Sequence, residues 1–191
     1  MKTVFVDVDT QIDFLYPAGA LYAAGAEKIV RRIGALNHWA ASQQIPVVST
    51  MCAHSENDAE FQSWPPHCVL GTVGQQKPPV TLVEERVEWQ EGADVSAARQ
   101  ICFPKQQTDM FLSPQMPVLL DALGADRYVV YGVVTEVCVQ FAVEGLLRRG
   151  AKVEVVVDAI QPLKDADGQA VLQRMVERGV KLRKAAEVMA G

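Results

Sequence analysis

Short apolar runs alternate with segments of helical spacing along most of this chain. Thr3–Val8 is a β-branched run that is typical of a buried strand, and residues 26–42 place Ile29, Ile33 and Leu36 along one side of a helix. Further strands are expected at Pro46–Met51, Gln100–Phe103, Arg127–Val133, Lys152–Ala159 and Val180–Leu182, and further helices at Ser113–Leu123, Glu136–Arg149 and Asp165–Arg178. Strands that alternate with helices predict an α/β fold, in which a parallel sheet carries helices on both faces.

The segment between residues 55 and 105 differs from the rest of the chain. It is rich in proline, glycine and charge, and its periodicity is weak. Val80–Trp89 is expected to hold an additional pair of short strands. Because irregular segments of this length in a compact domain are usually functional or disordered, and because unusual residue combinations lie here, we expect this one to be functional.

Length and composition fit a single soluble domain. The chain has 191 residues, of which 49% are hydrophobic and 21% charged, with a formal net charge of -5. No cluster of lysine or arginine stands out, so nucleic acid is not expected as a partner. No apolar stretch is long enough to span a bilayer, and the first residues do not resemble a signal peptide, so a cytoplasmic protein is expected.

Several residues with chemical potential lie directly after predicted strands. Asp9 follows the first strand, Cys52 and His54 follow the second, Lys105 follows Gln100–Phe103, and Cys138 follows Arg127–Val133. In an open parallel sheet, ligands bind beyond the carboxyl ends of the strands. These five side chains are therefore expected to meet at one edge of the sheet.

Cys138 is a candidate nucleophile. A thiol between a strand and a helix feels the positive end of the helix dipole, which favours the thiolate, and the free N–H groups there can bind an oxyanion. Asp9 could serve as general base and then general acid, while Lys105 would hold both groups as anions. The alternatives are a buried structural cysteine, a capping aspartate and a solvated loop lysine.

Cys52, His54 and His67 form a candidate metal site. The four cysteines are widely spaced and include no Cys-x-x-Cys pair, so free thiols, metal ligands or a nucleophile are expected rather than a disulfide framework. One thiolate and two imidazoles with an open position suit catalytic zinc. The alternative is two loop histidines without a metal.

Together these segments resemble the cysteine hydrolases of the isochorismatase-like superfamily, and within it the nicotinamidases most closely. The matching motifs occur in the family's order and extend from Thr3 to about Ala159. They are VDTQIDF at Val8–Phe14, PAGAL at Pro17–Leu21, GAE at Gly25–Glu27, WPPHCV at Trp64–Val69 followed by Gly71 and Thr72, FPK at Phe103–Lys105, and GVVTEVCV at Gly132–Val139. The set is specific for the superfamily, and the motif at Trp64 points to nicotinamidases.

The resemblance implies one hydrolase domain over residues 1–191, with six parallel strands in a three-layer α/β/α arrangement. It implies a catalytic triad of Asp9, Lys105 and Cys138. It also implies a cis peptide between Val133 and Val134, with the N–H groups of Val134 and Cys138 forming an oxyanion hole. The implied reaction releases ammonia from a small carboxamide through a thioester.

The resemblance also implies how the substrate is held. Phe14 and Trp64 match the positions of the aromatic pocket that holds the pyridine ring in nicotinamidases. The family's metal site has Asp-x-His followed by a distant histidine, whereas this chain has Cys52 at the position of the aspartate, before His54 and His67. A divalent metal, zinc above all, is implied with a softer donor set. The family also tends to form homo-oligomers.

Three other functions are compatible with the same motifs. One is a superfamily amidase that acts on a carbamoyl or ureido compound or on another non-pyridine amide. A second is cleavage of a vinyl ether, as in isochorismatase itself, which needs no cysteine at position 138. A third is a non-catalytic binding protein on the same fold, against which the presence of Asp9, Lys105 and Cys138 together argues.

Overall fold

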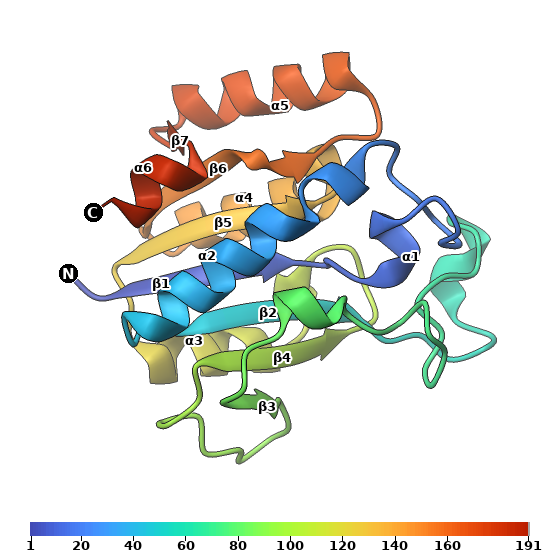
Figure 1. Cartoon of the computed structure of the whole chain (residues 1–191), viewed down its shortest axis with the longest axis horizontal. Helices are drawn as coiled ribbons and strands as arrows, with labels where there is room; N and C mark the ends of the chain where they lie inside the picture. The colour runs from blue at the N-terminus through green and yellow to red at the C-terminus, as the bar shows by residue number, and fades with distance from the viewer. Residues whose placement is uncertain (191) are drawn as a thin grey trace.

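A seven-stranded parallel sheet forms the centre of the molecule and carries helices on both faces (Figure 1). The computed structural model describes residues 1–190. In spatial order the strands are β3 (Arg86–Glu88), β4 (Gln100–Lys105), β2 (Val47–Cys52), β1 (Thr3–Val8), β5 (Arg127–Val133), β6 (Lys152–Gln161) and β7 (Lys181–Arg183). Every neighbouring pair is parallel. The predicted three-layer α/β fold is confirmed.

The sheet has seven strands rather than the six that the family resemblance implies. The additional strand is β3 at one edge, which pairs Val87 with Ile101 of β4. Residues 80–89 therefore contribute one strand to the sheet and not the predicted pair. β3 has only three residues and a single partly buried side chain, that of Val87, so its pattern is too short to mark it as a strand in the sequence.

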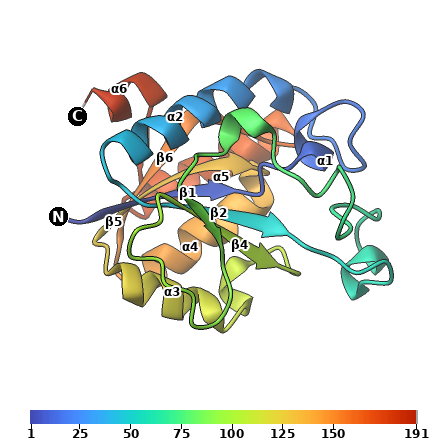
Figure 2. The same ribbon diagram turned by 60° about the horizontal axis from the view of Figure 1, so that its bottom comes forward.

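Two groups of helices cover the sheet (Figure 2). One face carries α2 (Val30–Ser42) and α6 (Ala185–Met189), and the other carries α3 (Gln115–Leu123), α4 (Gln140–Arg148) and α5 (Asp165–Glu177). The short elements are α1 (Ile12–Leu15), η1 (Ala26–Lys28), η2 (Ala59–Gln62), η3 (Pro79–Thr81), η4 (Met110–Leu112) and the π-helical turn η5 (Thr135–Val139). No helix among residues 1–190 has the length and apolar character that crossing a membrane requires.

The central strands are buried on both faces, as their continuous apolar runs predict. Val4, Phe5 and Val6 of β1 are all fully buried. On the face beneath α2, aromatic contacts tie the strands to the helix, since the ring of Phe5 lies 5.8 Å from that of Trp39 and 6.1 Å from that of Tyr131. This packing holds α2 against β1 and β5.

The carboxyl ends of β1, β2, β4 and β5 lie together on the right of Figure 1. The register aligns Val8 with Thr50 and Gly132, and it aligns Cys52 with Lys105. The residues that follow each strand are consequently brought to one edge of the sheet, as the sequence predicts.

Candidate active site

Asp9 lies directly after β1 in a tight backbone bend. Its φ angle is 50°, in the left-handed region, and the residue is 1% exposed. The Thr50 hydroxyl on β2 donates to Asp9 Oδ1 at 2.7 Å, and Asp9 Oδ2 lies 2.8 Å from Lys105 Nζ. The bend and these two partners hold the carboxylate in one orientation at the floor of the site.

Lys105 is the last residue of β4 and its side chain is buried. Besides Asp9, its Nζ lies 3.4 Å from Cys52 Sγ and donates to the carbonyl of Gln107 at 2.9 Å. Burial by itself lowers the pKa of this ammonium, but the neighbouring carboxylate of Asp9 and the thiols of Cys52 and Cys138 outweigh burial and hold the pKa well above its ordinary value. Lys105 is therefore a permanent positive charge.

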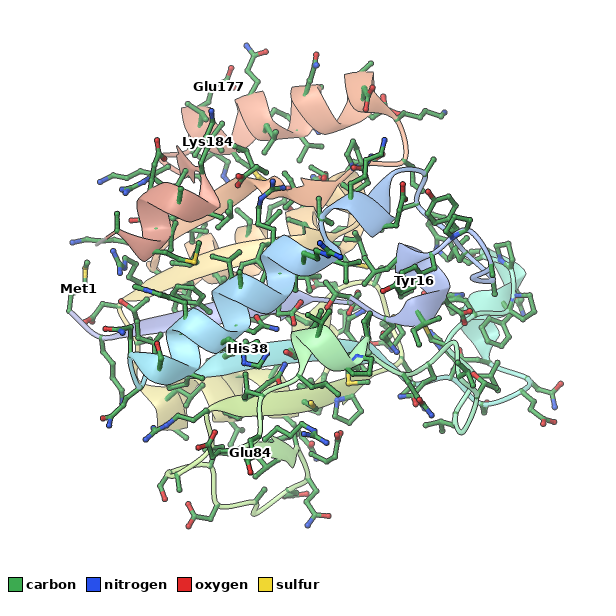
Figure 3. The ribbon with its side chains drawn as sticks, in the orientation of Figure 1. Met1, Tyr16, His38, Glu84, Glu177 and Lys184 are labelled. Atoms are coloured by element: carbon green, nitrogen blue, oxygen red, sulfur yellow. The ribbon has the colours of Figure 1, made fainter. Side chains whose placement is uncertain are left out.

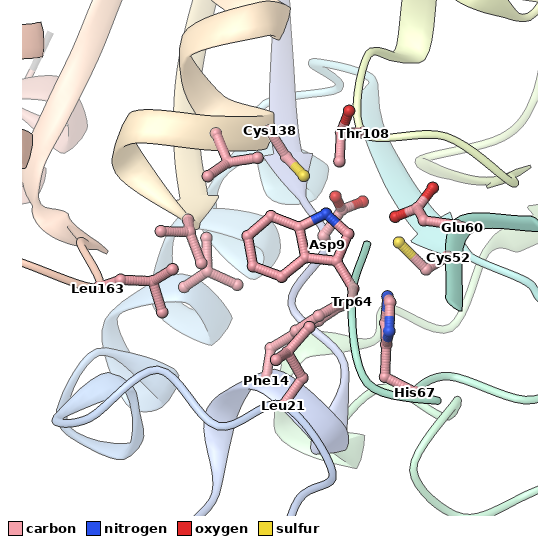
Figure 4. Close-up of a pocket in the computed structure, with 13 residues that line it drawn as sticks. Asp9, Phe14, Leu21, Cys52, Glu60, Trp64, His67, Thr108, Cys138 and Leu163 are labelled. Carbon is pink, nitrogen blue, oxygen red and sulfur yellow. The ribbon is translucent and has the colours of Figure 1, made fainter. Parts of the chain in front are cut away.

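Cys138 lies in the π-helical turn η5 between β5 and α4, at the position predicted for a helix start. It is half-buried and faces the same pocket as Asp9 (Figure 4). Burial raises the pKa of its thiol well above the ordinary value, and Lys105 only partly offsets this. This result differs from the expected thiolate. The resting group is a neutral thiol, which needs a base, and Asp9 lines the same pocket.

The segment before Cys138 has an unusual backbone. The peptide between Val133 and Val134 is cis, as the resemblance implies. The Val134 carbonyl accepts from the N–H groups of Val137 and Val139, both at 3.1 Å. Among the residues that the structure describes, the N–H of Val134 has no backbone acceptor outside helices and strands, so it is available to a bound oxyanion.

Cys52, His54 and His67 form a buried cluster. Their ligand atoms all lie within 4.8 Å of one another, although the three residues come from β2 and from two parts of the following loop. His67 Nδ1 lies 2.8 Å from the Pro65 carbonyl, which leaves the lone pair of Nε2 free to bind a metal. His54 Nδ1 lies 3.1 Å from Asp58 Oδ2. A carbonyl or carboxylate behind each imidazole is the arrangement that metal-binding histidines use.

Two further observations show that this cluster fits a divalent metal. Within residues 1–190, Nε2 of His54 has no hydrogen-bond partner, although the side chain is fully buried. Burial also lowers the pKa of His67, which favours the neutral imidazole, and raises the pKa of the Cys52 thiol to about 12. A cation here would satisfy the orphaned nitrogen and compensate the charge of a cysteine thiolate.

A pocket lies between Cys138 and the cluster (Figure 4). The side chains of Phe14 and Trp64 both line it, as predicted, and the Phe14 ring lies 5.3 Å from that of His67. The complete lining is Asp9, Phe14, Leu21, Cys52, Glu60, Trp64, His67, Thr108, Val133, Val134, Val137, Cys138 and Leu163. The wall around the nucleophile is apolar and partly aromatic, which suits a small flat ligand.

Six of these lining residues are not among the sequence candidates, and three of the six also lie outside the family motifs. Leu163 reaches the pocket from the connection between β6 and α5, Glu60 from η2, and Thr108 from the loop after β4. Burial raises the pKa of Glu60, whose carboxylate points toward Cys52 (Figure 4). Only the position of Leu163 after a strand could have identified it, because none of the three belongs to a recognisable motif.

Comparisons with known proteins identify the class. The sequence profile of the Isochorismatase domain matches residues 3–187, and this chain belongs to the isochorismatase family of hydrolases. It is 27% identical over 190 residues to the nicotinamidase/pyrazinamidase of Mycobacterium tuberculosis, an alignment that covers 92% of this chain and 95% of that protein.

Two solved structures extend the comparison. The pyrazinamidase of Pyrococcus horikoshii in complex with zinc superposes with a TM-score of 0.81 at 26% identity, covering 96% of this chain and 99% of that one. The N-carbamoylsarcosine amidase of Thermoplasma acidophilum shares the fold, with a TM-score of 0.80 at 22% identity and 97% of each chain covered.

Proposed function

We propose that this protein is an amidohydrolase that converts nicotinamide to nicotinate and ammonia through a thioester on Cys138. The observation that carries this proposal is the position of the buried Asp9 carboxylate near both Lys105 and Cys138. Asp9 Oδ2 lies 2.8 Å from the ammonium of Lys105, and Asp9 lines the same pocket as Cys138. A nucleophile and its base then face one pocket, and a fixed positive charge contacts the base.

In the first half of the proposed reaction, Asp9 takes the proton of the Cys138 thiol while sulfur attacks the carboxamide carbon. The developing oxyanion is bound by the backbone N–H groups of Val134 and Cys138. Asp9 returns its proton to the amide nitrogen, the C–N bond breaks, and ammonia leaves a thioester behind. The ammonium of Lys105, 2.8 Å from Asp9 Oδ2, offsets the negative charge that passes from Asp9 to the sulfur and then to the oxyanion.

In the second half, Asp9 takes a proton from water, which attacks the thioester carbon. The C–S bond breaks, the carboxylic acid is released, and the proton on Asp9 returns to Cys138. One carboxylate thus serves as base and acid in alternation. Contacts with Thr50 and Lys105 fix the position of the Asp9 carboxylate. A fixed position suits both roles, because all of these proton transfers take place within the same small pocket.

Zinc is the metal that best fits Cys52, His54 and His67, with Glu60 beside them. When bound, it supplies a Lewis-acid contact for a ring nitrogen or a water. The relatives support this proposal, since the P. horikoshii pyrazinamidase structure contains zinc. Phe14, Trp64 and Leu163 would hold a flat ring from the apolar side.

The experiment is an ammonia-release screen with the purified protein. The panel contains nicotinamide, pyrazinamide and several carbamoyl compounds, each with and without a chelator. Nicotinamide is expected to be the best substrate, and Cys138→Ala is expected to abolish release. Cys102→Ala is the matched control, because Cys102 is buried in β4 outside the pocket.

Two results would count against the proposal. Full ammonia release by the Cys138→Ala variant would exclude the thioester route. Activity on carbamoyl compounds without activity on nicotinamide would favour the second candidate, an amidase for non-pyridine amides, which the shared fold of the N-carbamoylsarcosine amidase supports. A protein that binds these amides without turnover would instead be a binding protein on this fold.

A further inference from the structure

A second buried ion pair lies behind the candidate site and takes no part in the proposed chemistry. Lys77 Nζ lies 2.8 Å from Asp7 Oδ2, and neither side chain is exposed. Asp7 also accepts hydrogen bonds from Thr10 Oγ1 at 2.7 Å, from Asn37 Nδ2 at 2.9 Å and from Ser49 Oγ at 3.0 Å. The carboxylate is therefore held by partners from β2, from α2 and from two loops.

The segment after Lys77 is fastened to the same layer. The Thr81 carbonyl accepts from Asn37 Nδ2 at 2.7 Å and from Gln100 Nε2 at 3.1 Å. Helix α2 approaches this segment so closely that a side chain at Gly34 would overlap the carbonyl of Val80. Residues 77–81 are thus held against the sheet and α2.

The segment before Lys77 runs beside the chain that follows Asp9. The N–H groups of Ile12 and Asp13 donate to the carbonyls of Gln76 at 2.9 Å and Gly74 at 3.0 Å. A side chain at Gly74 would overlap the Asp13 carboxylate. The backbones of the two segments are in direct contact, so a displacement of one segment displaces the other.

The same residues hold the backbone next to the candidate metal ligands. Asp13 Oδ2 accepts from the N–H of Cys68, the neighbour of His67, at 2.7 Å. Gln11 accepts from the N–H of Cys52 at 2.6 Å and donates to its carbonyl at 2.8 Å. A continuous chain of contacts therefore joins the buried pair to both segments that carry the cluster.

A buried ion pair is rarely more stabilising than apolar residues of the same size, so net stability does not explain its presence. A fully satisfied polar network does specify one arrangement, because every alternative leaves a buried charge unpaired. We propose that the Asp7–Lys77 pair positions the metal-ligand loop, residues 53–77, against β1. The inference rests on the proposed function only in taking Cys52, His54 and His67 as the metal ligands. Lys77 itself is a positioning residue.

The test compares hydrogen exchange and Zn²⁺ binding in the whole protein. Lys77→Met alone leaves the Asp7 carboxylate buried without its counter-charge, which is strongly destabilising. The Asp7→Asn/Lys77→Met double variant, which removes both charges, is therefore the decisive one. Leu120→Ala is the matched control, because it opens a cavity under α3 on the other face of the sheet.

In the double variant, exchange in peptides from residues 53–77 is expected to accelerate at least about tenfold, while residues 127–148 stay as in the wild type. The affinity for Zn²⁺ alone, measured against a competing chelator, is expected to fall at least about tenfold. Leu120→Ala should lose global stability and keep both local properties. A conservative Lys77→Arg variant should retain most of the loop protection.

Loop exchange within about twofold of the wild type in the double variant would overturn the proposal. Equal acceleration of the loop in Leu120→Ala would overturn it too, because the pair would then contribute only to general stability. A wild-type protein that neither binds Zn²⁺ nor releases ammonia would refute the proposed function instead, and the exchange comparison would still decide whether the pair holds the loop.

Discussion

Replacing Gly132 with alanine is expected to destabilise the fold and to disturb the candidate site at the same time. Gly132 has a φ angle of 121° and pairs with Val8, and a Cβ atom at this position would overlap the Val8 backbone. A left-handed backbone costs an alanine about 1–2 kcal/mol, and overpacking adds about 1–3 kcal/mol. The free energy of unfolding should therefore fall by about 2–5 kcal/mol, a large part of the ~5–15 kcal/mol of an ordinary domain.

The Gly150→Ala variant separates the cost of backbone strain from the cost of overpacking. Gly150 also has a positive φ, of 75°, but nothing lies within 4 Å of an added Cβ, so only the backbone strain applies. Urea denaturation of the two variants side by side measures the difference as a shift in midpoint at constant slope. The reasoning is refuted if Gly132→Ala is no less stable than Gly150→Ala. Asp9 follows β1 and Val134 follows β5, and these are the two strands that the added Cβ of Gly132→Ala would crowd. The value of kcat should therefore fall in Gly132→Ala and not in Gly150→Ala.

Three further outcomes are expected. Because burial raises the pKa of Cys138, alkylation of its thiol by iodoacetamide should still be accelerating above about pH 9, and a plateau near neutral pH in the mass-spectrometric rate profile would contradict the neutral resting thiol. Cys52→Ser should weaken Zn²⁺ binding at least about tenfold in a chelator competition, whereas Cys52→Asp should restore much of it, and equal affinity in all three proteins would exclude Cys52 as a ligand. Leu163→Ala should raise KM for nicotinamide about tenfold with little change in kcat, and an unchanged KM would remove Leu163 from the substrate site.

The layered fold and the meeting point of the candidate residues follow from local sequence. Alternating apolar runs and helical segments predict parallel strands, and parallel strands bring their carboxyl ends to one edge. Local sequence therefore predicts that Asp9, Lys105 and Cys138 lie close together. In the structure Asp9 and Cys138 line one pocket, and Lys105 contacts Asp9 directly.

Other features have no local signal. Strand β3 is held by backbone pairing to β4 rather than by its own apolar pattern, and Leu163 enters the pocket only because β6 ends beside β5. Lys77 looks like an ordinary loop lysine in the sequence, although it is buried against Asp7. In each case the partner lies far away along the chain.

For the charge state of Cys138, the sequence and the tertiary structure lead to different conclusions. Sequence determined that a thiol lies at a strand-to-helix junction, where a helix dipole and a lysine favour the thiolate. Only the tertiary structure decided how deeply that thiol is buried and how close Asp9 lies to it, and both raise its pKa. Residue type and order decide which groups can react, but desolvation and the distances between charges arise only when distant segments pack together.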